Sequence, residues 1–121
     1  MLEVTFFRDE HGRHAGVQAL GHADFAEHGA DIVCAAVSAI LQAARLGLEH
    51  YAAGEIVAMQ EPGRLRVVLN EGCRDRESLA ALLTAAELSV TQVARRFPEH
   101  VSVAHERIVP KAETRRPDSG N

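Results

Sequence analysis

Cys34 and His22 are the residues of this chain whose types and spacing best suit nucleophilic chemistry. Cys34 lies at the start of a long periodic apolar segment, three residues after Asp31, a residue type that caps helices. With Asp31 as N-cap, Cys34 falls in the first helical turn, where unpaired amides and the helix dipole favour a thiolate. The alternative is a buried cysteine that packs as a small apolar side chain.

His22 is the candidate base for that thiol. It ends an expected strand, immediately after Gly21, and the next element along the chain carries Cys34. An imidazole beside a thiol is the smallest set for thiol catalysis, because it takes the thiol proton and later protonates the leaving amine. A surface histidine beside a loop is the alternative, since the chain has 7 histidines.

Gly21, Asp31 and Ser38 are the expected supporting residues. Asp31 is expected first to cap the helix, and its carboxylate can also hold His22 in one tautomer, as the third member of a triad does. Ser38 lies one turn beyond Cys34, where it either lines the site or is a solvated helix position. Free backbone amides near residues 33 and 34 can offer an oxyanion site.

The other metal-binding residue types do not form a ligand set by their spacing. Structural zinc sites combine paired cysteines with cysteines or histidines, and Cys73 stands alone. His11 and His14 are expected to be solvated turn residues. Cys73 is expected at the start of a second helix without a chemical role, although a second reactive thiol stays open there. We expect no metal and no other cofactor.

Two strands, a loop and a long helix must position the candidate pair. Alternating apolar residues predict strands over 2–7 and from residue 14 to about residue 22, around a polar turn. Apolar residues spaced by three and four predict a helix from Asp31 to about residue 53. A loop is expected to join His22 to this helix. It consists of Ala23, Asp24, Phe25, Ala26, Glu27, His28, Gly29 and Ala30.

The second half of the chain follows the same order of elements. Pro62 and Gly63 mark the turn of a hairpin over 56–69, and a second helix is expected over 74–97, ended by a proline. A last strand is expected over 101–108. The order ββα-ββα-β predicts an α+β fold, a two-layer sandwich with a mixed or antiparallel sheet and both helices on one face. The face of the sheet that points away from the helices must then be polar, or another part of the protein must cover it.

Composition predicts one domain over residues 1–109. A chain of 121 residues with 46% hydrophobic residues suits a single core, and the polar segment 110–121 is expected to be a disordered tail. The net charge of −4 argues against direct nucleic-acid binding and against an anionic membrane surface. No uncharged apolar run reaches the roughly eighteen residues of a membrane span. The two cysteines are too few for a disulfide scaffold and indicate a reducing cytoplasm.

The segment around the candidate pair resembles one known family. Its motif elements are Gly21-His22-Ala23 and Gly29-Ala30-Asp31-Ile32-Val33-Cys34-Ala35-Ala36-Val37-Ser38. They are similar to the motif of the ribosomal-processing cysteine proteases, called Prp, with the same spacing between histidine and cysteine. The resemblance covers about residues 1–108.

The resemblance implies an endopeptidase that removes the N-terminal extension of a large-subunit ribosomal protein. It implies His22 and Cys34 as the catalytic pair, a mobile loop over 23–30, cleavage after an aromatic pair, and a homodimer. The alternative function is a non-enzymatic ribosome-associated or redox-sensing protein with a reactive Cys34. A sensor needs an exposed thiolate but no base, so a histidine within reach of Cys34 favours the protease.

Overall fold

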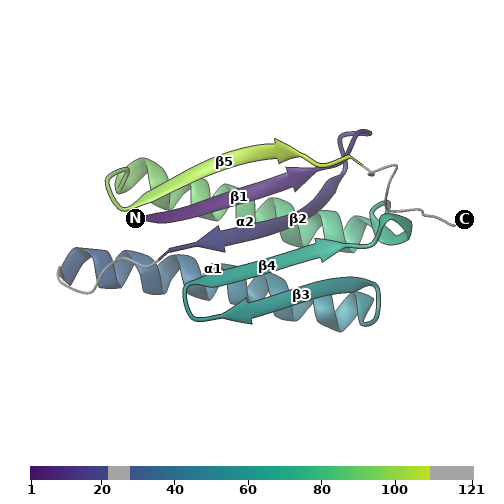
Figure 1. Ribbon diagram of the computed structural model, residues 1–121, viewed down its shortest axis with the longest axis horizontal. Helices are drawn as coiled ribbons and strands as arrows, with labels where there is room; N and C mark the ends of the chain where they lie inside the picture. The colour runs from purple at the N-terminus through teal and green to yellow at the C-terminus, as the bar shows by residue number, and fades with distance from the viewer. Residues whose placement is uncertain (22–27, 110–121) are drawn as a thin grey trace, which may run out of the picture.

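One five-stranded sheet and two helices make up the described part of the protein. The computed structural model describes residues 1–21 and 28–109, and the side chains of 28–31 lie outside the description. The strands are β1 Leu2–Arg8, β2 His14–Leu20, β3 Ile56–Glu61, β4 Arg64–Leu69 and β5 Val101–Arg107. The helices are α1 His28–Ala52 and α2 Glu77–Arg96, with a 3₁₀ turn at Glu71–Cys73. The predicted α+β class, the order of elements and the two-layer arrangement are confirmed (Figure 1).

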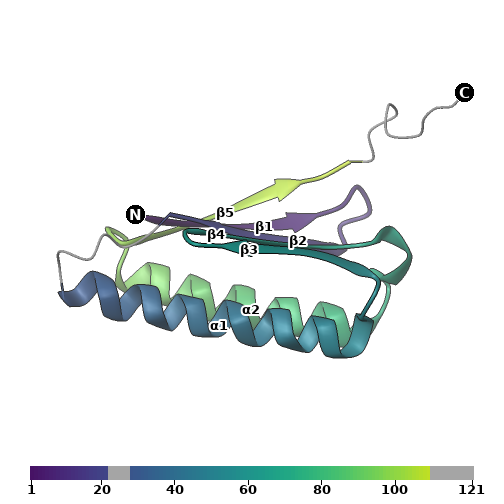
Figure 2. The same ribbon diagram turned by 60° about the horizontal axis from the view of Figure 1, so that its bottom comes forward.

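The sheet is mixed, in the order β3-β4-β2-β1-β5. β5 pairs parallel with β1, and the other neighbours pair antiparallel. α1 therefore connects the parallel strands β2 and β3, and α2 connects the parallel strands β4 and β5. The two crossovers move in opposite directions across the sheet, and the strand pairs that they join also run in opposite directions. Two crossovers of the same hand then lie on the same face, and both helices do cover one face (Figure 2).

This topology gathers four chain segments at one end of the sheet. β2 ends beside the start of β1. β3 runs parallel to β2, so it ends at the same end of the sheet. The β3–β4 turn therefore lies at that end. Figure 1 places the beginning of α1 there as well, so the residues around Gly21 and Cys34 come from neighbouring elements.

The core lies between the helices and the inner face of the sheet. Its largest buried side chains include Phe6, Val17, Val67, Leu69, Val37, Leu48, Leu79, Leu83 and Val90. By length and composition alone, the segment Ile32–Ala52 of α1 is apolar enough to cross a membrane. Its residues at 33, 37, 41, 44 and 48 belong to this core, so α1 packs beneath the sheet with one apolar face.

No described element covers the outer face of the sheet (Figure 2). Its largest apolar residue, Phe7, is nevertheless only 2% exposed. The guanidinium of Arg66 lies over the Phe7 ring, 4.9 Å from its centroid, and donates a hydrogen bond to Gln18 Oε1 at 2.8 Å. A polar side chain thus provides the cover that the apolar residue needs.

The prediction of a solvated His14 is wrong. His14 is 6% exposed, and its Nε2 lies 3.0 Å from Thr84 Oγ1 on α2. A register shift between Phe7 and Arg8 adds an unpaired residue to β2, so both His14 and Val17 face the helices. A bulge of this kind interrupts the period of two and cannot be read from an alternating pattern.

Both helix starts differ from the prediction. α1 begins at His28 rather than at Asp31, so the predicted loop is three residues too long, and α2 begins at Glu77 rather than at residue 74. Aspartate is favoured both as an N-cap and inside the first turn, so its presence does not define the first residue of a helix. Cys73 belongs to the 3₁₀ turn that precedes α2.

Candidate active site

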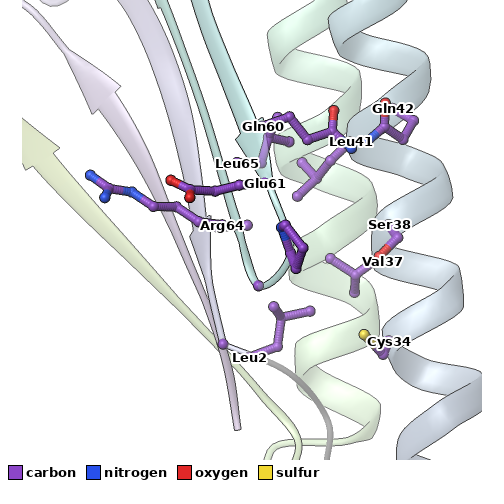
Figure 3. A pocket seen from close by; sticks show the side chains of 14 residues that line it. Leu2, Cys34, Val37, Ser38, Leu41, Gln42, Gln60, Glu61, Arg64 and Leu65 are labelled. Carbon is purple, nitrogen blue, oxygen red and sulfur yellow. The ribbon is translucent and has the colours of Figure 1, made fainter.

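A pocket of about 440 Å³ lies between α1 and the β3–β4 hairpin. Its volume is typical of sites that bind small molecules or peptide side chains. Cys34 and Ser38 line it from α1, Leu2 and Gly21 line it from the strand ends, and the hairpin forms the opposite wall. Figure 3 shows the Cys34 sulfur directed into the space between α1 and Leu2.

The start of α1 at His28 changes the predicted environment of Cys34. Cys34 is half-buried and is the seventh residue of α1, in its second turn. From the fifth residue onward the amides of an α-helix donate to carbonyls within it, so those of Val33 and Cys34 do not form the predicted oxyanion site. The influence of the helix dipole also falls off after the first turn. The pocket, rather than the helix terminus, gives Cys34 its access to a substrate.

Gly21 forms part of the pocket wall through its backbone. Its φ is 99°, and a Cβ atom at this position would overlap the carbonyl oxygen of Met1. The Gly21 N–H donates a 2.9 Å hydrogen bond to the carbonyl of Gly63 in the β3–β4 turn. Only glycine fits this close approach, and the hydrogen bond fixes the direction in which the chain continues to residue 22.

The structure brings together three of the predicted site residues: Gly21, Cys34 and Ser38 line the same pocket. His22 and residues 23–27 lie outside the described part of the chain, so the contact between His22 and Cys34 stays a prediction. Asp31 is the fourth residue of α1 and not its N-cap, and its side chain is likewise outside the description.

Four polar residues of the pocket were missed by the sequence analysis: Gln42, Gln60, Glu61 and Arg64. Gln42 follows Cys34 and Ser38 at helical intervals of four, a spacing that places all three on one side of α1 and could have identified it. The other three residues belong to the β3–β4 hairpin. They line the pocket only because the strand order places this hairpin beside α1, and that order cannot be read from the local sequence.

Cys73 is a buried structural thiol. Its Sγ donates to the carbonyls of Asn70 at 3.3 Å and Glu55 at 3.6 Å. Burial raises the pKa of the Cys73 thiol, and the nearby Glu55 carboxylate raises it further. A protonated, enclosed thiol is a poor nucleophile, which answers the question of a second reactive cysteine.

Metal-ligating residues do not gather in the described ranges 1–21 and 28–109, where no three histidine, cysteine or carboxylate side chains are placed to hold an ion.

Comparison with known proteins gives one family and several solved structures that resemble this chain. The sequence matches the family described as cysteine protease Prp over residues 1–102. The solved structure of SMU.848 from Streptococcus mutans is 28% identical, with a TM-score of 0.76, over 89% of this chain and 96% of that one. The ribosomal processing protease Prp of Staphylococcus aureus, solved with a substrate peptide and with a covalently linked product peptide, is 20% identical. Its TM-score is 0.75, over 87% of this chain and 99% of that one.

Comparison with curated protein sequences gave no match. The family match nevertheless spans most of the chain and includes every element up to the start of β5. It does not favour the redox-sensing alternative. The chain belongs to the cysteine protease Prp family.

Proposed function

We propose that this protease removes the N-terminal extension of a large-subunit ribosomal protein, with Cys34 as nucleophile and His22 as general base and acid. The observation that carries the proposal is the Cys34 thiol, which opens into a pocket whose wall ends at Gly21, the residue before His22. Family membership supplies the reaction class. The Staphylococcus aureus relative, a ribosomal processing protease solved with a substrate peptide, supports the class of substrate.

The proposed reaction has two steps. Cys34 Sγ attacks the scissile carbonyl carbon while His22 accepts the thiol proton, and His22 then protonates the departing amine as the C–N bond breaks. The extension is left as a thioester on Cys34. A water molecule, deprotonated by His22, attacks that thioester, releases the extension as a carboxylic acid and restores the thiol.

Asp31 and Ser38 support this pair in the proposal. Asp31 precedes Cys34 by about one helical turn, and in the proposal its carboxylate orients the His22 imidazole. Ser38 follows Cys34 by about one turn and lines the pocket, where its exposed hydroxyl can contact the bound peptide. The loop that precedes α1, now bounded at residues 23–27, is proposed to close over the peptide.

The proposal also includes a homodimer, a cytoplasmic location and no cofactor. Exposed apolar side chains on the helices support a second copy as partner, namely Ile32, Leu46 and Leu88. The free thiols of Cys34 and Cys73 suit a reducing compartment.

The test is incubation of the purified chain with a peptide that spans the N-terminal extension and the first residues of the mature ribosomal protein. Mass spectrometry should show two fragments from a single cut after the aromatic pair. An uncleaved peptide, together with peroxide oxidation of Cys34, would instead support the redox-sensing alternative.

A further inference from the structure

The pocket continues from Cys34 along α1 to an end formed by two glutamines. Ser38 and Gln42 follow Cys34 along the helix, and Gln60 extends toward Gln42 from β3 (Figure 3). Between the thiol and the glutamines, the lining combines the hydroxyl of Ser38 with apolar side chains from Val37, Leu41 and Leu65. A peptide bound at Cys34 therefore meets this mixed lining first and amide groups beyond it.

The amide of Gln42 has a defined orientation. Arg45 Nε lies 3.0 Å from Gln42 Oε1, and Arg45 Nη1 lies 2.9 Å from Glu49 Oε2. A guanidinium carries donors only, so the group of Gln42 that faces Arg45 must be its carbonyl oxygen. The Gln42 NH₂ group then points away from Arg45. Glu49 holds the guanidinium from its other end, which keeps this arrangement in place.

The Gln42 NH₂ group is available to a ligand. No residue in the described ranges accepts a hydrogen bond from it, and Gln42 is half-buried in the pocket wall. The group is therefore open to the pocket, where a carbonyl oxygen of a bound peptide can accept from it in place of water.

The geometry of α1 gives the position of that carbonyl along the substrate. Gln42 lies eight residue steps after Cys34 along α1, a rise of about 12 Å. An extended peptide advances about 3.3 Å per residue, so this distance corresponds to between three and four residues. We propose that Gln42 is a specificity-determining residue that donates to a substrate carbonyl three or four residues from the scissile bond, with Arg45 as its positioning residue. This inference rests on the proposed peptidase function.

Gln42→Glu tests the donor, because it replaces the NH₂ group by an acceptor of the same shape. We expect kcat/KM for the extension peptide to fall about tenfold, mainly through KM, since a single hydrogen bond of this kind is lost. Gln18→Glu is the matched control. Gln18 Oε1 also accepts from an arginine, Arg66, but it lies on the outer face of the sheet, so its kcat/KM should not change.

A double-mutant cycle tests the role of Arg45. Arg45→Met frees the Gln42 amide to rotate, and we expect kcat/KM to fall about threefold while the thermal midpoint changes little. In a Gln42→Met background, Arg45→Met should have no further effect on kcat/KM. Equal effects of Arg45→Met in both backgrounds would overturn the positioning role.

Two sources of the substrate carbonyl can be separated with peptides that carry alanine three or four residues from the scissile bond. If a substrate side chain supplies the oxygen, the unaltered chain and Gln42→Glu should have the same kcat/KM for one of the alanine peptides. If the peptide backbone supplies the oxygen, kcat/KM of the variant should remain lower for every peptide. Unchanged kcat/KM for Gln42→Glu, with normal cleavage by the unaltered chain, would overturn the inference. Absence of cleavage by the unaltered chain would contradict the proposed function itself.

Discussion

At the scale of single residues, Gly21 joins the end of β2 to the segment that carries the proposed base His22. Its φ is 99°, and the overlap that a Cβ atom would make with the Met1 carbonyl oxygen leaves no room for a side chain. We expect Gly21→Ala to lower the free energy of unfolding by about 2–3 kcal/mol and to reduce kcat/KM, because the chain that leads to His22 must shift. Urea unfolding and peptide cleavage measure the two effects.

Gly12→Ala is the control for Gly21→Ala. Gly12 also has a positive φ, 79°, but no atom lies within 4 Å of the position that its Cβ would take. Its substitution should reduce stability by only about 1 kcal/mol and leave kcat/KM unchanged. Equal losses for the two variants would show that the close contact at Gly21 is unimportant.

His14 makes the stability of the fold depend on pH. Burial lowers the pKa of His14 below its ordinary value, the positive charge of Arg8 lowers it further, and Glu87 partly opposes both. The unfolded chain then binds a proton at a higher pH than the folded chain does. The free energy of unfolding should therefore decrease as pH falls below about 6.5 and continue to decrease until the folded pKa is passed.

His14→Gln removes this titration while a side-chain amide can still reach Thr84. We would measure urea unfolding at pH 7.5 and pH 5.5, each about one unit from the pKa of a free histidine. The free energy of unfolding should decrease less between these two pH values in the variant than in the unaltered chain. The two proteins differ only at residue 14, so the difference between their pH effects reports on His14. An identical pH effect would contradict this account.

At the scale of elements, Asp9 joins the β1–β2 turn to the segment before α2. It is 1% exposed and accepts hydrogen bonds from the amides of His11 and Arg13, and from the guanidinium groups of Arg13 and Arg74. Burial opposes the ionised carboxylate, but these hydrogen bonds together lower the pKa of Asp9 to about 2. This stabilisation should be complete above pH 3.8 and should be lost as pH falls from there to about 2.

Asp9→Asn should reduce the free energy of unfolding by about 2–3 kcal/mol, because two guanidinium groups lose a buried carboxylate. Asp75→Asn is the control. Asp75 lies 3.0 Å from the same Arg13 but is 81% exposed, so its loss should change stability by less than about 1 kcal/mol. Denaturant unfolding at neutral pH compares them, and similar values for the two variants would refute the structural role of Asp9.

The start of α1 at His28 changes what is expected of Asp31. Because Asp31 is inside the helix and is not its cap, Asp31→Asn should lower the free energy of unfolding only by the small helix-dipole contribution, about 0.3–1 kcal/mol. If its carboxylate orients His22, as proposed, kcat should fall about tenfold or more. Thermal unfolding and the pH–rate profile measure these effects. A much larger loss of stability with an unchanged rate would indicate a capping role after all.

At the scale of the whole molecule, the layers followed from periodicity but the pocket did not. The period of two in residues 2–7 and the spacing of Val33, Val37 and Leu41 predicted the hairpin and the core face of α1, because burial imposes both patterns. The pocket wall at Gln60 and Arg64 depends on β4 pairing with β2, a contact between distant segments. The inward turn of His14 depends on a bulge. Neither leaves a local pattern in the sequence.

The central claim is that Cys34 is the nucleophile, and the kcat/KM of Cys34→Ala for the extension peptide tests it most directly. Cys34 is half-buried at the pocket, so we expect the variant to keep the thermal midpoint of the unaltered chain and to show no cleavage. Cys34→Ser should be nearly inactive as well, because a hydroxyl is much harder to deprotonate than a thiol. Substantial cleavage by a folded Cys34→Ala variant would contradict the account.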